Sequence, residues 1–192
     1  LLWCTPCYIE PIQMRVYLNY LFEKEFGREK IAAMIYHLAK LQASMGVKII
    51  CQKYGYAESI KEKFDLLNLN IGQFELLGYG SFKKELTDFK KNLFIYSSES
   101  AYAKSYSSQF KSQKFSVDYF ISGLWAGCIE AIIEKEVTCL ETKCVASGSK
   151  LCEFVTKETK SWDKDAIKNS KFLFDPKLTK QIISDLKVFF VR

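Results

Sequence analysis

The spacing of hydrophobic residues changes from a helical to a strand period at the break Gly78-Tyr79-Gly80. Before this break, apolar residues recur at helical spacing, which predicts amphipathic helices over 11–25, 28–45, 59–67 and 71–77. Gly46 either ends the second helix or lets it approach a neighbour. After the break, two short runs of alternating apolar and polar residues flank a polar turn, which predicts a β-hairpin over 82–97.

The second half of the chain repeats this order of helix and hairpin. Serines at 97–101 supply N-cap chemistry for a short helix through Tyr106, and an apolar helix is expected over 118–133. A second hairpin follows over 137–157. Helices, a hairpin, a helix and a hairpin predict an α+β fold with helices packed on an antiparallel sheet.

Two cysteines stand at equal distances on either side of Gly148 in the second hairpin. A turn centred on Gly148 brings the sulfurs of Cys144 and Cys152 to face each other across neighbouring strands, with Glu141 close by in the chain. Thiolate and carboxylate together suit zinc. The spacing alone leaves two interpretations open: a metal site, or a buried cysteine pair or disulfide beside a surface glutamate.

The same region resembles the signature of the 4-vinyl-reductase domain family, which binds small hydrophobic molecules. The resemblance lies in Asp118-Tyr-Phe-Ile-Ser-Gly-Leu-Trp-Ala-Gly127, in Glu141-Thr-Lys-Cys144, in Gly148 and in Cys152-Glu-Phe154. It implies a structural zinc bound by the ligands Asp118, Glu141, Cys144 and Cys152. Aspartate stands where relatives of the aromatic-sensing type have a cysteine, and this exchange makes the site harder and less selective for a soft metal.

The resemblance also implies a fold and a division of the chain. The fold would be similar to TRAPP vesicle-tethering subunits and to ligand-binding domains of the NO-signalling type. Residues 1–26 would form an N-terminal arm and dimerisation helix, 27–157 the ligand-binding domain, and 158–192 a linker and a C-terminal helix. Apolar residues on the first helix exceed what a short extension needs, which supports a homodimer.

The helix over 118–133 is apolar nearly all round and is therefore expected to be buried. Its glycines Gly123 and Gly127, one turn apart, indicate close approach of another helix or the wall of a cavity, and both interpretations stay open. The family's cavity implies a pocket for a small hydrophobic or aromatic molecule. The residues we expect to line it are Tyr102, Tyr106, Phe120, Leu124 and Trp125.

Signatures of catalysis are missing from the sequence. His37 is the only histidine, and no nucleophile elbow, metalloprotease helix, P-loop or dinucleotide fingerprint occurs. A non-enzymatic binding or sensor domain is therefore favoured. Two alternatives stay open: a 4-vinyl reductase or accessory factor in tetrapyrrole biosynthesis, and a scaffold or dimerisation adaptor with a closed core.

The charge pattern argues against nucleic acid as a partner. The net charge of +6 comes from 28 basic and 22 acidic residues in mixed segments, and the only arginines are Arg15, Arg28 and Arg192. No apolar run approaches the roughly 20 residues that cross a bilayer. The first seven residues lack the features of a secretory signal, so we expect a cytoplasmic protein with reduced cysteines and no membrane partner. Cys4 and Cys7 form only a weak redox motif.

Overall fold

The computed structural model describes residues 11–55, 58–110 and 112–190, so Cys4 and Cys7 lie outside the described residues. The helices are α1 (Ile12–Phe26), α2 (Arg28–Tyr54), α3 (Ile60–Leu76), α4 (Ala101–Gln109), α5 (Tyr119–Ile133), α6 (Lys164–Asn169), α7 (Lys171–Phe174) and α8 (Pro176–Phe190). The strands are β1 (Phe82–Asp88), β2 (Leu93–Ser98), β3 (Val137–Lys143) and β4 (Cys152–Glu158). Short 3-10 turns, η1 (Val145–Ser147) and η2 (Thr159–Ser161), flank β4.

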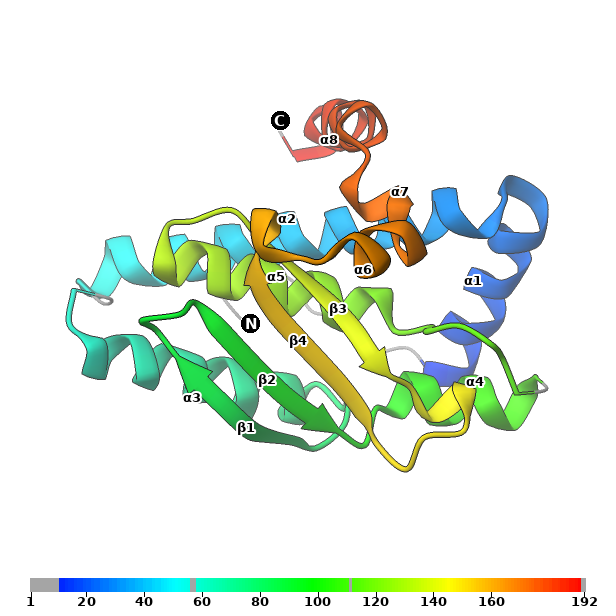
Figure 1. The fold of residues 1–192 in the computed structure, drawn as a ribbon, viewed down its shortest axis with the longest axis horizontal. Helices are drawn as coiled ribbons and strands as arrows, with labels where there is room; N and C mark the ends of the chain where they lie inside the picture. Colours follow the sequence, from blue (N-terminus) through cyan, green and yellow to red (C-terminus); the bar gives the residue numbers. More distant parts are fainter. Residues whose placement is uncertain (1–10, 56–57, 111, 191–192) are drawn as a thin grey trace.

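The four strands form one antiparallel sheet in the order β1-β2-β4-β3, which confirms the predicted fold class. The two hairpins join through β2 and β4, where Tyr96 pairs with Phe154 and Ser98 with Cys152. Helices α5, α3 and α2 lie behind the sheet in Figure 1, with α5 in contact with both the sheet and α2. An all-round apolar helix is stable in this middle layer because it is covered on every side.

Helices α2 and α5 approach each other at the two glycines of α5. A Cβ atom on Gly123 would lie 2.3 Å from the carbonyl oxygen of Tyr36, and one on Gly127 would lie 2.1 Å from that of Lys40. Such distances are far inside van der Waals contact, so only glycine lets the two backbones come this close. Close helix packing, and not a cavity wall, is therefore the role of both glycines.

Two helices run further than the sequence predicts. Gly46 does not end α2, which continues to Tyr54 and stops at Gly55 in the left-handed conformation, with φ of 67°. The two weak helical signals merge into the single helix α3, whose start is fixed by a capping box between Ser59 and Glu62. Packing against neighbouring elements adds the stability that propensity alone does not supply.

The outer edge of β3 is covered by side chains in place of another strand. The Val137 N–H donates to Glu130 Oε2 at 3.1 Å, and the Val137 carbonyl accepts from Lys40 Nζ at 2.7 Å. The Cys139 N–H donates to the Tyr36 hydroxyl at 3.1 Å. Such capping blocks the pairing of this edge with a further strand, a common source of aggregation.

The segment after β4 packs against the body of the protein. Trp162 Nε1 donates to the Thr138 carbonyl at 3.2 Å, and Phe172 meets Tyr119 edge-on with ring centroids 5.7 Å apart. These contacts hold α6 and α7 beside β3, and α8 lies beyond them, at the top of Figure 1. The part of the chain predicted as a linker is thus helical and seated on β3 and α5.

His37 connects α2 to the start of α8, because its Nε2 lies 3.2 Å from the Thr179 hydroxyl. Burial, and secondarily the charge of Lys40, lower the pKa of His37 from 6.5 to about 4. The unfolded chain therefore binds this proton more tightly than the fold does. Stability from neutral His37 is present above pH 6.5 and is lost as the pH falls toward 4.

We expect this titration to be measurable as a difference between two proteins. Between pH 7 and pH 4 the wild type should lose up to about 3 kcal/mol of unfolding free energy through His37, and His37→Gln should lack this contribution. Urea denaturation at several pH values, followed by circular dichroism, measures both. All other titrating groups are common to the two proteins. If the unfolding free energies of wild type and His37→Gln change with pH in parallel, the prediction is wrong.

The described helices include none with the length and apolarity needed to cross a bilayer.

Candidate metal centre

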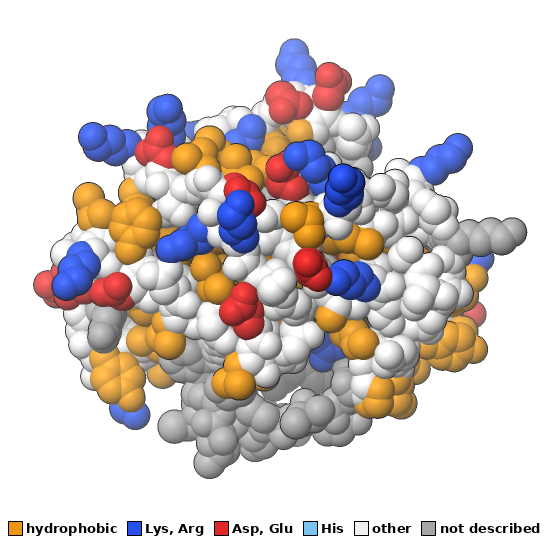
Figure 2. Space-filling view, turned by 90° about the horizontal axis from the view of Figure 1, so that it is seen from below, with side chains coloured by type: hydrophobic (Ala, Val, Ile, Leu, Met, Phe, Trp, Pro, Cys, Tyr) orange, Lys and Arg blue, Asp and Glu red, His pale blue; other side chains and the backbone are white. Residues whose placement is uncertain are grey.

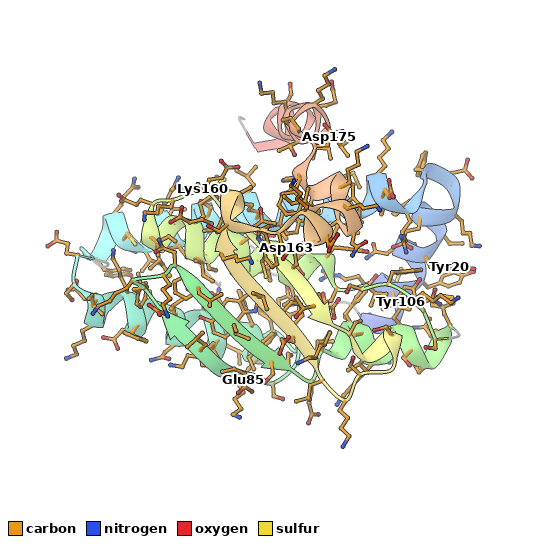
Figure 3. The ribbon with its side chains drawn as sticks, in the orientation of Figure 1. Tyr20, Glu85, Tyr106, Lys160, Asp163 and Asp175 are labelled. Atoms are coloured by element: carbon orange, nitrogen blue, oxygen red, sulfur yellow. The ribbon has the colours of Figure 1, made fainter. Side chains whose placement is uncertain are left out.

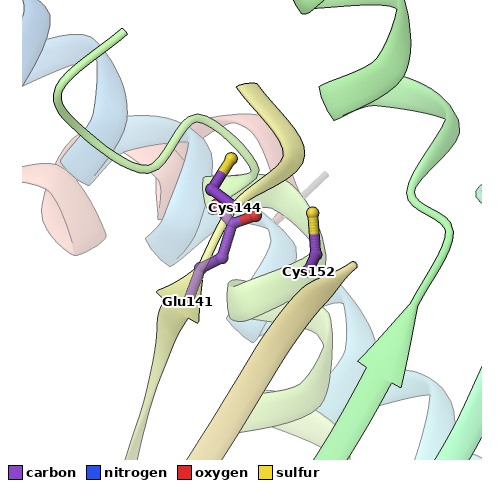
Figure 4. A group of neighbouring side chains, drawn as sticks. All are labelled: Glu141, Cys144 and Cys152. Atoms are coloured by element: carbon purple, nitrogen blue, oxygen red, sulfur yellow. The ribbon is translucent and has the colours of Figure 1, made fainter. Parts of the chain in front are cut away.

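The second hairpin brings three potential metal ligands together. Glu141 lies near the end of β3, Cys144 follows that strand, and Cys152 begins β4. A register shift after Glu141 and the left-handed Gly148, with φ of 97°, let the chain turn back between the two cysteines. One ligand atom from each residue lies within 4.8 Å of the other two. Figure 4 shows the three side chains at this end of the hairpin.

Glu141 presents one carboxylate oxygen to this group. Its Oε2 accepts hydrogen bonds from the backbone N–H groups of Val117 and Asp118, at 3.1 and 3.0 Å. Its Oε1 is buried and has no hydrogen-bond partner among the described residues. Burial, followed by the negative charge of Cys144, raises the pKa of Glu141 well above 4.5. A buried carboxylate beside two sulfurs must be neutralised by a proton or by a bound cation, and a donor set of one carboxylate and two thiols fits a metal ion.

The two thiols are also arranged as a donor pair. A hydrogen bond from Cys152 lowers the pKa of Cys144 to about 6, and the same contact, with burial, raises the pKa of Cys152. The Val145 N–H points at the Cys152 sulfur at 3.4 Å. Backbone N–H groups favour the charged form of sulfur. Zinc binds cysteine as thiolate, which this environment supports for at least one of the pair.

Asp118 lies beside this group with its carboxylate turned to other partners. It is the N-cap of α5, where its Oδ1 accepts from the Ile121 N–H at 3.2 Å and its Oδ2 accepts from the Ser100 hydroxyl. Burial, and then the charge of Glu141, raise the pKa of Asp118 to about 7. The cluster of Glu141, Cys144 and Cys152 does not include it. Its role as the fourth ligand stays a prediction.

Two serines contact the residues of this site, and the sequence analysis did not predict these contacts. Ser100 caps α4 and also binds the Asp118 carboxylate, and Ser116 Oγ donates to the Glu141 carbonyl at 2.7 Å. Ser100 carries a local signal, because it starts a helix. No sequence signal connects it to Asp118, and none places Ser116 against β3.

Trp125 and Leu124, two of the predicted pocket residues, lie in the packed core. The Trp125 ring stacks on Tyr96 with centroids 3.8 Å apart and planes at 5°, and Phe74 packs against its edge. Trp125 is fully buried, while its indole N–H has no partner among the described residues. The core around this helix is therefore filled largely by aromatic rings.

The other predicted pocket residues, Tyr102, Tyr106 and Phe120, lie nearer α1. The Tyr102 hydroxyl accepts from Asn19 Nδ2 at 3.0 Å, and Figure 3 shows Tyr106 near Tyr20 of α1. The Phe120 ring packs edge-on against that of Tyr79, with ring centroids 5.3 Å apart. None of the five residues lines any of four cavities, of about 520 to 720 Å³, that lie among the described residues. Their role in ligand binding stays a prediction.

No family model matches the sequence, and no curated protein matches it. Solved structures do match. The phenol-responsive sensory domain of the transcription activator PoxR, solved with phenol, has a TM-score of 0.72 at 12% identity, covering 88% of this chain and 84% of that chain. A vinyl-4-reductase family protein from Methanocaldococcus jannaschii has a TM-score of 0.51 at 20% identity, covering 82% and 86%.

A third structure is the trafficking protein particle complex subunit 3 from Naegleria fowleri, solved covalently bound to palmitic acid. Its TM-score is 0.52 at 11% identity, over 76% of this chain and 93% of that chain. The three TM-scores establish a common fold, and at such low sequence identity the likeness extends to the fold alone. The chain therefore has the vinyl-4-reductase type of α+β fold, shared with a TRAPP subunit, that the motif between Asp118 and Phe154 predicted.

Proposed function

We propose that this protein is a binding or sensor domain for a small hydrophobic or aromatic molecule, with a structural zinc at the second hairpin. The observation that carries the proposal is the buried group of Glu141, Cys144 and Cys152, with its orphaned carboxylate oxygen. It occurs in a fold shared over 88% of the chain with a sensory domain that was solved with phenol. Fold alone does not give function, so the site is the stronger part of the argument.

The zinc would be held by the Glu141 carboxylate and the thiolates of Cys144 and Cys152, with Asp118 as the predicted fourth ligand. A site closed by four protein ligands leaves no open position for water, so its role is structural. Bound there, the ion would tie the end of β3 to the start of β4. Through the backbone of Val117 and Asp118, Glu141 would extend this tie to the first turn of α5.

A native mass spectrum of the purified, reduced protein tests both parts of the proposal. We expect one zinc ion per chain, and a bound or added aromatic molecule that raises the mass by one ligand. A chain without zinc, with a disulfide between Cys144 and Cys152, would refute the metal site. A chain that takes up no phenolic, isoprenoid or fatty compound would refute the binding function.

The mass spectrum separates the scaffold alternative from the proposal, and an activity assay separates the reductase alternative. A scaffold with a closed core is favoured by the packing of Trp125 against Tyr96, and it would show zinc but no organic ligand. A 4-vinyl reductase would consume reduced nicotinamide or flavin when a vinyl tetrapyrrole is added.

We further propose a homodimer formed through α1. Met14, Tyr17 and Leu21 lie on one exposed stripe of this helix. A stripe that pairs with its own copy around a two-fold axis would bury these side chains. On the face seen in Figure 2, hydrophobic side chains are interspersed with lysines and acids.

Leu21→Glu should therefore convert the dimer to a monomer, because two buried carboxylates would face each other across the axis. Light scattering at micromolar concentration measures the mass. Leu76→Glu, at an exposed position at the end of α3, is the matched control and should stay dimeric. A monomeric wild type would reject the interface, as would a dimer that Leu21→Glu leaves intact.

A further inference from the structure

A cavity of about 590 Å³ lies between the edge of β3, the segment that leads into α5, and the C-terminal helices α6 and α7. Its size is typical of small-molecule sites. Its walls combine polar and apolar groups in similar measure, and its large apolar and aromatic lining residues are Phe115, Tyr119, Leu140, Trp162, Phe172 and Leu173. None of these belongs to the pocket predicted from the sequence.

The walls of this cavity are held in place by contacts from separate elements. Trp162 is fixed by its hydrogen bond to the Thr138 carbonyl, and Phe172 by its edge-on contact with Tyr119. Trp162 directly follows η2 and Thr138 lies in β3, whereas Phe172 belongs to α7 and Tyr119 to α5. The cavity is therefore a product of the docked C-terminal segment, and an occupant would contact that segment and the body of the domain together.

Positive charge lies at this cavity. Arg28 and Lys114 are the basic residues of its lining, and the Arg28 guanidinium lies over the Phe115 ring at 3.6 Å from the centroid. Glu141 is the acidic residue of the lining, and its Oε2 is already bound by two backbone N–H groups. Cations beside aromatic walls are complementary to a molecule with a flat apolar body and a carboxylate.

We propose that this cavity binds an aromatic carboxylate, with the ring between Trp162 and Phe115 and the carboxylate at Arg28 and Lys114. The inference rests on the proposed binding function and specifies a place and a ligand class for it. Because Trp162, Phe172 and Leu173 precede α8 in the chain, an occupant would also fix the position from which α8 begins.

Calorimetric titration with 1-naphthoate and with its neutral analogue 1-naphthamide tests this site. The double variant Arg28→Gln/Lys114→Gln should weaken 1-naphthoate at least about ten-fold and leave 1-naphthamide within about two-fold. Ala166→Trp, which places a large ring on the α6 wall, should abolish binding of both. Lys90→Gln, in the turn between β1 and β2, removes a charge elsewhere and should change nothing. Thermal unfolding of each variant confirms that it is folded.

Three results would overturn the inference. If 1-naphthoate binds Ala166→Trp as tightly as wild type, the ligand lies elsewhere and the binding function survives. If the double variant weakens both probes equally, the cations do not recognise the carboxylate. If wild type binds neither probe, this cavity is not an aromatic site. The proposed function itself fails only if the native spectrum also finds no organic ligand of any class.

Discussion

Gly127→Leu is expected to destabilise the protein more than any other single substitution in the helical layer. A Cβ at this position would lie 2.1 Å from the Lys40 carbonyl oxygen and 3.0 Å from Ala43 Cβ. The obstructing atoms belong to backbone and to a rigid methyl group, so only separation of α2 and α5 relieves the clash. Overpacking costs typically 1 to 3 kcal/mol and more where nothing yields, so we expect a loss of about 3 kcal/mol or more.

Urea denaturation followed by circular dichroism measures this effect. Gly46→Ala is the matched control, because Gly46 lies within α2 and a Cβ there would meet nothing within 4 Å. It should raise the unfolding free energy by up to about 1 kcal/mol through helix propensity. An unchanged midpoint for Gly127→Leu would show that the two helices are not packed this closely.

Cys144→Ser should abolish zinc binding and lower the stability of the second hairpin. Binding to a structural zinc site contributes about 10 to 16 kcal/mol in zinc-finger peptides. This domain has a core of its own, so we expect a part of that, several kcal/mol. A chelator should lower the unfolding midpoint of the wild type to that of Cys144→Ser and leave the variant unchanged. Cys51→Ser, on α2 away from the cluster, should keep its zinc.

Asp118→Asn separates the two roles of the aspartate. If Asp118 is a zinc ligand, the variant should lose metal as Cys144→Ser does. If it only caps α5 and binds Ser100, zinc stays, and the helix loses little stability because asparagine caps a helix about as well as aspartate. Metal analysis of both variants distinguishes these results. Full zinc occupancy in Cys144→Ser would contradict the assignment of the metal centre itself.

Features set by local spacing were predictable from the sequence. The two hairpins, the N-cap chemistry before α4 and the approach of Cys144 to Cys152 across Gly148 depend on residues near one another in the chain. Turn residues and strand alternation fix such geometry before any long-range contact forms. The motif between Asp118 and Phe154 likewise pointed to the fold that the solved structures share.

Only the tertiary structure decided how these pieces meet. The hydrophobic pattern of an apolar helix that is covered on all sides does not indicate which face packs against which neighbour. The sequence therefore could not show that Gly123 and Gly127 face α2 and not a cavity. It could not join β2 to β4 or seat Trp162 on β3, because each contact links residues far apart in sequence. The sequence pattern thus determines the helices, strands and turns. Which face of a buried helix packs against which neighbour depends on how closely the two backbones can approach each other.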